Sequence, residues 1–517
     1  MSDWCRRSDA VTRDDTGSSD GQADAQEADD RSEDRLFEQR LDKLNRLRQA
    51  GIDPYPARFN RTDLAAAVVE SFEEEPGKQV RVAGRVVGGI RRMGRATFMH
   101  LQDATGRIQA FFRQNELGED AYALLDLVDT GDFLGVVGET MKTRTGEISV
   151  QVREFHVLSK ALRPLPEKWH GLQDVETRYR KRYLDLIANP EVMEVFRTRG
   201  RIVHEVRAFL VERGFLEVET PVLQTVAGGG AARPFETFYN ALDRTLSLRI
   251  ALELYLKRCI IGGIEKVFEI GRNFRNEGVS LKHNPEFTML EVYQAYADYE
   301  EIMRLTEDLV STVAERVLGT TKIVVKGDVE VDVAPPWKRT SLRDAIYEAS
   351  GVDYDEHPTA DSLAQAAQEA GLRVQDGWTR GKIIDELLSV FVEPKITSPV
   401  FLVDYPLELS PLAKQRTDRS EIVERFEAFC GGMELANAFS ELNDPLDQRE
   451  RFLEQARQKG TGDDEAMPFD AAFLEALEHG MPPTGGMGLG IDRLTMVLTG
   501  QDKIRDVILF PQLRTLE

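Results

Sequence analysis

The sequence has few cysteines and no long apolar run. Its three cysteines, Cys5, Cys259 and Cys430, lack the paired spacing of a zinc site or a disulfide framework. We therefore expect reduced thiols, a cytoplasmic location and no structural zinc. No stretch of about 18 apolar residues is present, which excludes a membrane-spanning helix. The first residues, MSDWCRRSDAVTRDD, lack the apolar core of a signal peptide.

Positive charge is also in short supply. The 517 residues contain 66 Lys and Arg against 89 Asp and Glu, a formal net charge of -23. This balance argues against a protein that coats nucleic acid through bulk electrostatics, and we expect no DNA partner. An acidic chain can still bind RNA through a few positioned basic and aromatic side chains.

Two common phosphate-binding signatures are missing. The chain has no GxxxxGK[ST] loop, so the sequence does not support P-loop phosphate chemistry. The glycine-rich stretch TGGMGLGIDRL, residues 484–494, lacks the spacing and the acidic follow-on of a dinucleotide fingerprint. A bound nucleotide would therefore need another arrangement of residues.

The N-terminal part of the chain changes character twice. Residues 1–35 are rich in Asp, Ser, Gly and Ala, which predicts a disordered acidic tail. Residues 36–51 have leucines at helical spacing with basic residues among them, which predicts a helix that packs one face and either leaves the other in solvent or offers it to RNA. Short alternating runs with glycine-rich turns over residues 80–160 predict a small barrel in the strand order of an OB-fold. The helix and barrel together form a predicted domain over residues 36–165.

A larger domain is predicted to follow. Residues 166–190 contain two prolines before a charged helical stretch and are interpreted as a linker. Residues 191–517 form the second domain, with a peripheral insertion over about 334–396. At its start, a long helix ends before Gly214, and the next strand contains Pro221, which cannot donate a ladder hydrogen bond and should lie at an edge or interface.

Residues 268–299, FEIGRNFRNEGVSLKHNPEFTMLEVYQAYADY, predict a strand, a charged loop and a second strand. Alternation places Phe287, Met289, Glu291 and Tyr293 on one strand face. The loop before it carries five charged or titratable residues: Arg272, Arg275, Glu277, Lys282 and His283. Arginine matches phosphate oxygens and an aromatic ring can stack on a base, so the pattern favours a nucleotide beside a cationic ligand. The alternative is an exposed hairpin with solvated charges and core aromatics.

A second hairpin is predicted around Gly431 and Gly432, which would bring Glu427 and Glu434 roughly opposite each other. Facing carboxylates repel unless a cation lies between them, and a magnesium ion bridging ATP phosphates would satisfy that demand. The alternative is one exposed and one salt-bridged glutamate.

The strand after this turn places Asn437, Phe439 and Glu441 on one face, whereas Glu434 would point the other way in a regular strand. If all four side chains reach one pocket, a bulge or a break must lie between Glu434 and Asn437.

Phe274-Arg275-Asn276-Glu277 resembles motif 2 of class II aminoacyl-tRNA synthetases, and the flanking RNFRNEG and HNPEFTMLEVYQAYADY resemble the bacterial-type lysyl-tRNA synthetase family. The resemblance runs from about residue 36 to 513. Residues 490–493, at the end of the glycine-rich stretch, resemble motif 3, and the helix, strand and Pro221 resemble motif 1, the dimer element. The resemblance implies an α+β protein: an N-terminal OB-fold β-barrel, then a class II catalytic domain with an antiparallel sheet flanked by helices, in a homodimer.

The resemblance also implies a function. The chain would be a lysine–tRNA ligase that uses ATP and Mg²⁺ to convert L-lysine into lysyl-adenylate and then transfers lysine to the 3′ end of tRNA(Lys). Implied ATP-binding residues are Arg275, Glu277, His283, Asn284, Phe287 and Arg493, of which Arg275, Glu277 and Arg493 are catalytic. Implied metal ligands are Glu427 and Glu434, and implied anticodon contacts are Phe98, Gln109 and Glu147. Phe98 could equally be an ordinary barrel core residue.

The implied lysine-binding residues are Gly229, Glu253, Glu291, Tyr293, Asn437, Phe439 and Glu441. Glu253 stands in a mostly apolar helix, where it either faces solvent or meets a positive partner. A lysine ammonium needs compensating anions, which these glutamates would supply. An aspartyl or asparaginyl synthetase would instead want a cation here. The chain could also be a paralogue that lysylates a protein, or a catalytically inactive, RNA-binding regulatory paralogue.

Overall fold

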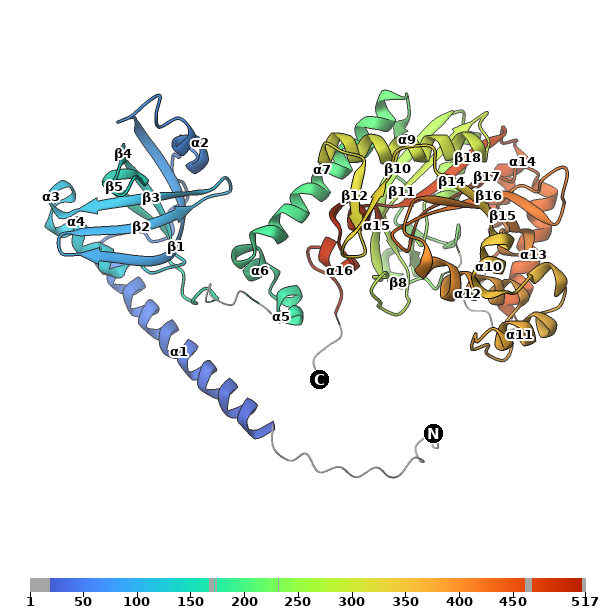
Figure 1. The fold of residues 1–517 in the computed structure, drawn as a ribbon, viewed down its shortest axis with the longest axis horizontal. Coiled ribbons are helices and arrows are strands. Elements are labelled where there is room, and N and C mark those ends of the chain that lie inside the picture. Colours follow the sequence, from blue (N-terminus) through green and yellow to red (C-terminus); the bar gives the residue numbers. More distant parts are fainter. Residues whose placement is uncertain (1–18, 167–171, 173, 231, 461–466, 514–517) are drawn as a thin grey trace. The chain divides into compact units, whose positions relative to one another are not determined.

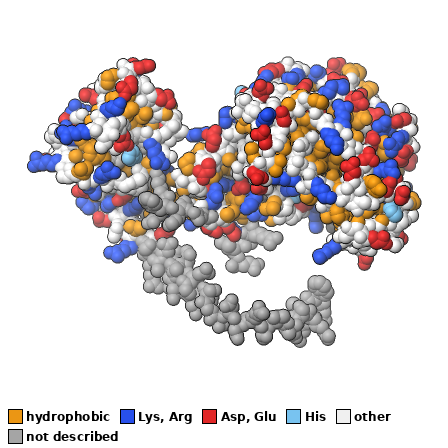
Figure 2. Space-filling view, in the orientation of Figure 1, with side chains coloured by type: hydrophobic (Ala, Val, Ile, Leu, Met, Phe, Trp, Pro, Cys, Tyr) orange, Lys and Arg blue, Asp and Glu red, His pale blue; other side chains and the backbone are white. Residues whose placement is uncertain are grey.

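The computed structural model describes residues 19–166, 172, 174–230, 232–460 and 467–513 (Figure 1). It contains two compact units, Met1–Gln173 and Asp174–Glu517. None of the helices within the described residues is both long and apolar enough to cross a membrane. Acidic, basic and hydrophobic side chains are interspersed on the face shown in Figure 2, so the net negative charge is not gathered into one patch there.

The first unit begins with α1, Ser19–Gln49, whose residues Leu44 and Leu47 are buried. The helix starts well before the predicted residue 36 and includes residues 19–35 of the predicted tail. This segment contains Ala, Gln and Glu, which have high helix propensity, and its charge did not prevent a helix. Residues 1–18 of the predicted tail lie outside the described residues. Two basic residues of α1 bind the barrel: Lys43 Nζ lies 2.5 Å from Asp129 Oδ1, and Arg40 donates to the carbonyl of Thr130.

The barrel confirms the predicted OB-fold. It is closed, in the strand order β1-β2-β3-β5-β4. Its strands are β1 Gln79–Met93, β2 Ala96–Gln102, β3 Arg107–Arg113, β4 Phe133–Lys142 and β5 Ile148–Ser159. Short helices accompany them: α2 Ala65–Glu70, α3 Gln114–Leu117 and α4 Glu119–Ala123. Strict alternation along β2 buries Thr97, Met99 and Leu101 inside the barrel and leaves Phe98 and His100 facing outward.

The second unit is built on an eight-stranded sheet in the order β14-β15-β16-β17-β18-β11-β10-β6. The six central strands run antiparallel to one another, whereas the edge strands β14 and β6 pair in parallel with β15 and β10, so the sheet is mixed. The strands are β6 Leu216–Glu217, β10 Lys266–Phe274, β11 Glu286–Ala295, β14 Lys338–Ser341, β15 Val400–Pro406, β16 Ile422–Cys430, β17 Met433–Ser440 and β18 Thr484–Gly490. Both predicted hairpins are confirmed, as β10–β11 and β16–β17.

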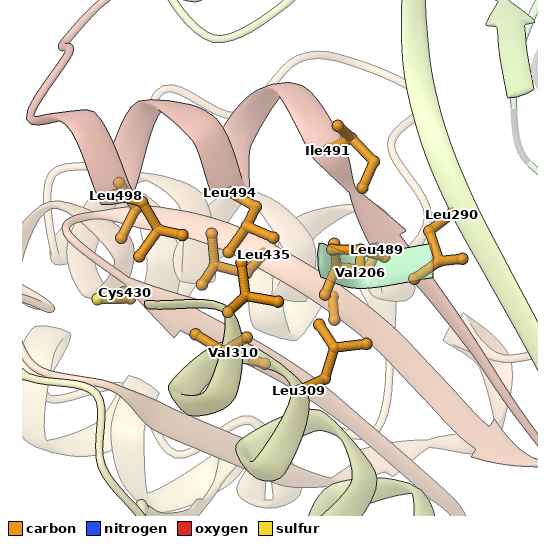
Figure 3. Close-up of a cluster of buried hydrophobic side chains, with 14 of the residues drawn as sticks. Val206, Leu290, Leu309, Val310, Cys430, Leu435, Leu489, Ile491, Leu494 and Leu498 are labelled. Atoms are coloured by element: carbon orange, nitrogen blue, oxygen red, sulfur yellow. The ribbon is translucent and has the colours of Figure 1, made fainter. Parts of the chain in front are cut away.

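Helices α7 Pro190–Glu212, α9 Tyr299–Leu318 and α15 Ile491–Thr499 pack on one face of this sheet. Figure 3 shows part of the core between them, where Leu290 and Leu489 of the sheet meet Val206, Leu309 and Leu494 of the helices. Since side chains alternate along β11, burying Leu290 against these helices turns Glu291 to the opposite face. That opposite face carries the candidate site.

The remaining elements surround this frame. The predicted linker region contains α5 Val175–Arg180 and α6 Arg182–Ala188. Helices α10 Leu342–Ser350, α11 Ala360–Glu369 and α12 Arg380–Leu387 fall within the predicted insertion. The other helices are α8 Glu253–Ile261, α13 Pro445–Gly460, α14 Ala471–Glu478 and α16 Ile504–Val507. One small sheet is formed by β7 Leu223–Gln224, β8 Glu236–Tyr239 and β9 Arg244–Leu248. A second small sheet is formed by β12 Lys322–Val325 and β13 Val329–Asp332.

The strand predicted around Pro221 is wrong as a single element. The structure splits it into β6 and β7, and Pro221 lies between them, exposed and outside both ladders. Proline has no N–H to donate, so a continuous strand would lose a ladder hydrogen bond at this position.

Candidate active site

The floor of the site is β18, which lies between β11 and β17 and is rich in glycine. A Cβ atom at Gly486 would clash with the carboxylate of Glu441 and lie 2.5 Å from Tyr293 Cε1. A Cβ atom at Gly488 would lie 2.5 Å from Met289 Cε. The glycines therefore make room for side chains that come from the two neighbouring strands.

Three glutamates from different elements are buried together above this floor. Glu253 is the first residue of α8, Glu291 lies on β11, and Glu441 directly follows β17. The Glu291 carboxylate accepts hydrogen bonds from the Leu252 N–H at 2.8 Å and the Tyr293 hydroxyl at 3.0 Å. Glu253 is also buried and does not face solvent, and α8 starts at this glutamate.

The glutamates are close enough to shift one another's protonation. Burial, together with the charge of Glu253, raises the pKa of Glu291 to about 7, although the hydrogen bonds from Leu252 and Tyr293 oppose the rise. Burial also raises the pKa of Glu441 well above its ordinary value, with Glu253 and Glu291 adding to it and Lys257 opposing it. The cluster therefore binds protons readily and is suited to a cationic ligand.

Lys257 was not predicted from the sequence, yet it lies inside this cluster. Its Nζ lies 2.6 Å from Glu253 Oε1 and also pairs with Glu441. Burial alone would lower the pKa of Lys257, but the charges of Glu253 and Glu441 outweigh it and raise that pKa. The i,i+4 spacing of Glu253 and Lys257 in the predicted helix was a signal that could have identified it.

A second group of residues forms an arginine-rich end of the site. The Arg275 guanidinium lies 5.2 Å from the centre of the Phe287 ring, and its Nε donates to the Ile250 carbonyl at 3.4 Å. Burial lowers the pKa of Arg275, and the charges of Glu277, Glu434 and Glu291 act against that shift. Arg275 is thus within electrostatic reach of the glutamate cluster.

Arg493, near the start of α15, reaches the same end. Its Nη1 donates to Glu434 Oε2 at 2.8 Å, and its Nη2 lies 3.2 Å from His283 Nε2. Partial burial and the charge of Arg493 lower the pKa of His283 to about 4, so this imidazole is neutral at pH 7 and can accept from Arg493. The two residues form a polar pair between the β10–β11 loop and the start of α15.

The β16–β17 hairpin corrects one prediction and confirms another. Glu427 pairs with Asn437, and Glu434 pairs with Phe429, so the two glutamates are not opposite each other. Ala428 pairs with Ala436 while the next residue pairs with Glu434, which leaves Leu435 as an extra residue on β17. This is the β-bulge that the sequence demanded between Glu434 and Asn437, and it turns Glu434 onto the face of Asn437.

Glu427 and Glu434 have the donor chemistry of a magnesium site. Burial and the charge of Glu434 raise the pKa of Glu427 to about 7, with Arg425 and the Tyr405 hydroxyl opposing the rise. Burial would also raise the pKa of Glu434, but Arg493, Arg275 and Arg425 lower it. Within the described part of the chain, no group of three or more acidic, His or Cys side chains could hold a metal. Two carboxylates therefore fit a magnesium ion only if phosphate and water oxygens complete its shell.

Three of the remaining predicted site residues lie beside residues already described, and a fourth, Asn284, is buried in the same unit. Gly229 has a φ of 84°, and an added Cβ would lie 3.0 Å from Glu253 Cβ, so glycine is required there on both counts. Asn437 Oδ1 accepts from Arg425 Nε at 3.1 Å, and the Phe439 ring lies 5.4 Å from Lys257 Nζ. Asn284 is buried and its side chain donates to the Glu286 carbonyl.

The predicted anticodon residues share the outer face of the barrel. Phe98 stacks on Phe111, with ring centres 4.4 Å apart and planes 9° apart. Gln109 Nε2 donates to Glu147 Oε2 at 2.6 Å, and His100 lies 2.7 Å from the other oxygen of Glu147. Phe98 is half-buried and faces outward, so it is not a residue of the barrel core. Phe111 and His100 were missed, although alternation on β2 and β3 would have placed them beside Phe98 and Gln109.

Both units match known families. Residues 174–514 match the model described as "tRNA synthetases class II (D, K and N)", and residues 80–158 match "OB-fold nucleic acid binding domain". The chain is 54% identical over 486 residues to the lysine–tRNA ligase of Moorella thermoacetica, which covers 94% of this chain and 99% of the relative. It is 53% identical to the lysine–tRNA ligases of Pelotomaculum thermopropionicum, with 96% and 98% covered, and of Roseiflexus castenholzii, with 93% and 99% covered.

The mixed sheet, the arginine-bearing hairpin and the OB-fold define a class II aminoacyl-tRNA synthetase. Within that class, the chain belongs to the lysine–tRNA ligase family.

Proposed function

We infer that the chain is a lysine–tRNA ligase, which activates L-lysine with ATP and transfers it to the 3′ end of tRNA(Lys). One observation carries this assignment: Glu253, Glu291 and Glu441 are buried together on the sheet face that also presents Arg275. Lys257 offsets only part of this negative charge, and a lysine substrate brings a second ammonium to the three carboxylates.

In the first step, a carboxylate oxygen of lysine attacks the α-phosphorus of ATP, and the bond to the bridging oxygen breaks to release pyrophosphate. Arg275 neutralises charge on the α-phosphate, and Arg493 with His283 holds the outer phosphates. Phe287 and Arg493 enclose the adenine, and Glu277 and Asn284 add polar contacts to the nucleotide. The protein orients the two substrates and stabilises charge, with no covalent enzyme intermediate.

In the second step, a hydroxyl of the terminal ribose of tRNA attacks the acyl carbon of lysyl-adenylate, and AMP leaves. Glu291 and Glu441 hold the lysine ammonium in both steps, and Tyr293, bonded to Glu291, fixes that carboxylate. Phe439 provides an apolar wall for the lysine stem. Gly229 lets the backbone approach the substrate, and Asn437 adds a polar contact.

Glu427 and Glu434 would hold magnesium, which supplies charge neutralisation on the ATP phosphates when bound. Glu434 accepts a hydrogen bond from Arg493, so a proposed metal ligand is in direct contact with a proposed phosphate-binding residue.

The OB-fold would bind the tRNA anticodon. Phe98, stacked on Phe111 and facing outward, offers a platform for a base, and Gln109 and Glu147 offer polar groups beside it. Aminoacylation serves translation, so we expect the protein in the cytoplasm.

We also propose a homodimer. Exposed apolar side chains lie on the segment that follows the motif 1 helix: Leu216, Leu223, Phe238, Tyr239 and Leu242, each more than 40% exposed. Such a group is typical of a protein interface. Sedimentation should show a dimer that Phe238→Asp weakens, and a native chain that sediments as a monomer at micromolar concentration would contradict it.

A screen of amino acids in ATP–pyrophosphate exchange tests the function. We expect exchange with lysine alone. Exchange with aspartate or asparagine would assign the chain to the related synthetases, and no exchange with any amino acid would make it an inactive paralogue.

A further inference from the structure

We propose that Lys257 is a positioning residue of the lysine site, whose ammonium holds the carboxylates of Glu253 and Glu441 in place and opposes protonation of Glu441 before the substrate ammonium arrives. This inference rests on the proposed function and adds a residue to it.

The geometry separates Lys257 from an ordinary core ion pair. Its side chain has no exposed surface, and both of its partners, Glu253 and Glu441, belong to the candidate substrate pocket. Two aromatic rings border the ammonium, Phe439 with its centre at 5.4 Å and Phe473 at 5.9 Å, and exclude water from it. A fixed cation therefore lies in the wall of the site that is to recognise a second cation.

The partners of Lys257 keep capacity for a ligand. Neither carboxylate oxygen of Glu441 has a hydrogen-bond partner among the described residues, apart from the ion pair with Lys257. A buried carboxylate with unused lone pairs is costly, and an incoming ammonium with three N–H donors would satisfy it. Lys257 thus orients Glu441 without saturating it.

The charges around Lys257 explain why it is needed. Glu253 faces it from α8, Glu441 from the end of β17, and Glu291 and Tyr293 lie beside them on β11. The charge of Arg275 also lowers the pKa of Glu291. Without Lys257, three neighbouring carboxylates would lie buried with only Arg275 to compensate them, and Glu441 would hold a proton more tightly. The substrate ammonium would then have to displace that proton.

This mechanism predicts a specific signature for Lys257→Met, which keeps the stem and removes the charge. We expect the KM for lysine in pyrophosphate exchange to rise about tenfold at pH 7, and the acidic limb of kcat/KM for lysine to move up by about one pH unit. Raising the pH should restore much of the lost lysine affinity, while the KM for ATP stays close to the native value.

Arg258→Met is the matched control, because it removes the next cation of the same helix, which pairs with Asp470 outside the pocket at 3.2 Å. It should leave the acidic limb in place, even if it lowers the melting temperature. Equal pH profiles for Lys257→Met and the native chain would overturn the proposal. A lower KM for lysine in Lys257→Met would also overturn it, because it would mean that Lys257 competes with the substrate.

A folding defect is handled by Lys257→Gln, which retains an N–H donor without the charge and should show the same pH shift. If both Lys257 variants fail to fold while Arg258→Met folds, Lys257 is a structural ion-pair residue and the proposal falls. Measurements on the native protein distinguish a failure of this proposal from a failure of the proposed function. If the native protein shows no lysine-dependent exchange, the proposed function is refuted. If the native protein shows exchange but the pH profile of Lys257→Met is not shifted, only the role of Lys257 is refuted.

Discussion

At the scale of single residues, we expect the charges of the glutamate cluster to decide which amino acid the site accepts. Glu291→Gln keeps the shape and the acceptor for the Leu252 N–H but removes one negative charge. We expect it to weaken lysine activation by on the order of 3 kcal/mol, roughly 100-fold in kcat/KM, because a buried ammonium loses its partner. Pyrophosphate exchange at varied lysine concentration measures this, with the exposed Glu300→Gln on α9 as the control. Unchanged lysine activation in both Glu291→Gln and Glu441→Gln would remove these residues from the site.

The pKa of Glu291 also predicts a pH dependence. Its folded-state pKa is raised to about 7, so the carboxylate is neutral below that pH and ionised above it. Binding of the lysine ammonium needs the ionised form, so kcat/KM for lysine should rise between about pH 6 and 8 with a midpoint near 7. The profile of Glu291→Gln should lack this limb, and a native profile that is flat over the same range would contradict the assignment.

At the scale of elements, β18 makes the pocket by having no side chain where its neighbours need space. Gly486→Ala places a Cβ against Glu441 and Tyr293. We expect the KM for lysine to rise more than about tenfold, because both side chains must move, while the KM for ATP changes less. The control is Gly200→Ala on α7, where an added Cβ meets nothing within 4 Å. An unchanged KM for lysine in Gly486→Ala would show that these two side chains do not define the pocket.

The bulge at Leu435 shows a second effect at this scale. A regular β17 would turn Glu434 into the core, whereas the extra residue buries Leu435 there and turns Glu434 to the site. Local sequence could state that a bulge was needed, since polar residues stood at both parities of one strand. The partner of Glu427 could not be predicted from the local sequence, because the bulge shifts the register of every pair between it and the open end of the hairpin.

At the scale of the whole molecule, the proposed function divides the work between the two units, with amino-acid activation in the second and tRNA selection in the first. Phe98→Ala should raise the KM for tRNA(Lys) about 5- to 100-fold, because it removes one stacking platform. Lysine-dependent pyrophosphate exchange without tRNA should be unchanged, since the site for it lies in the other unit. Aminoacylation and exchange assays on one preparation give both values. A loss in both assays, or in neither, would contradict an anticodon role for Phe98.

The sequence by itself predicted the barrel, both hairpins and a bulge or break before Asn437, because strand alternation and glycine turns are local properties. The resemblance of its motifs to a known family implied the catalytic fold and the acidic substrate site. Tertiary structure alone decided the rest. It placed Glu253, Glu291 and Glu441 around Lys257, it paired Glu427 with Asn437, and it divided the strand at Pro221. These features depend on which distant segments are buried against one another, and local spacing carries no record of that burial.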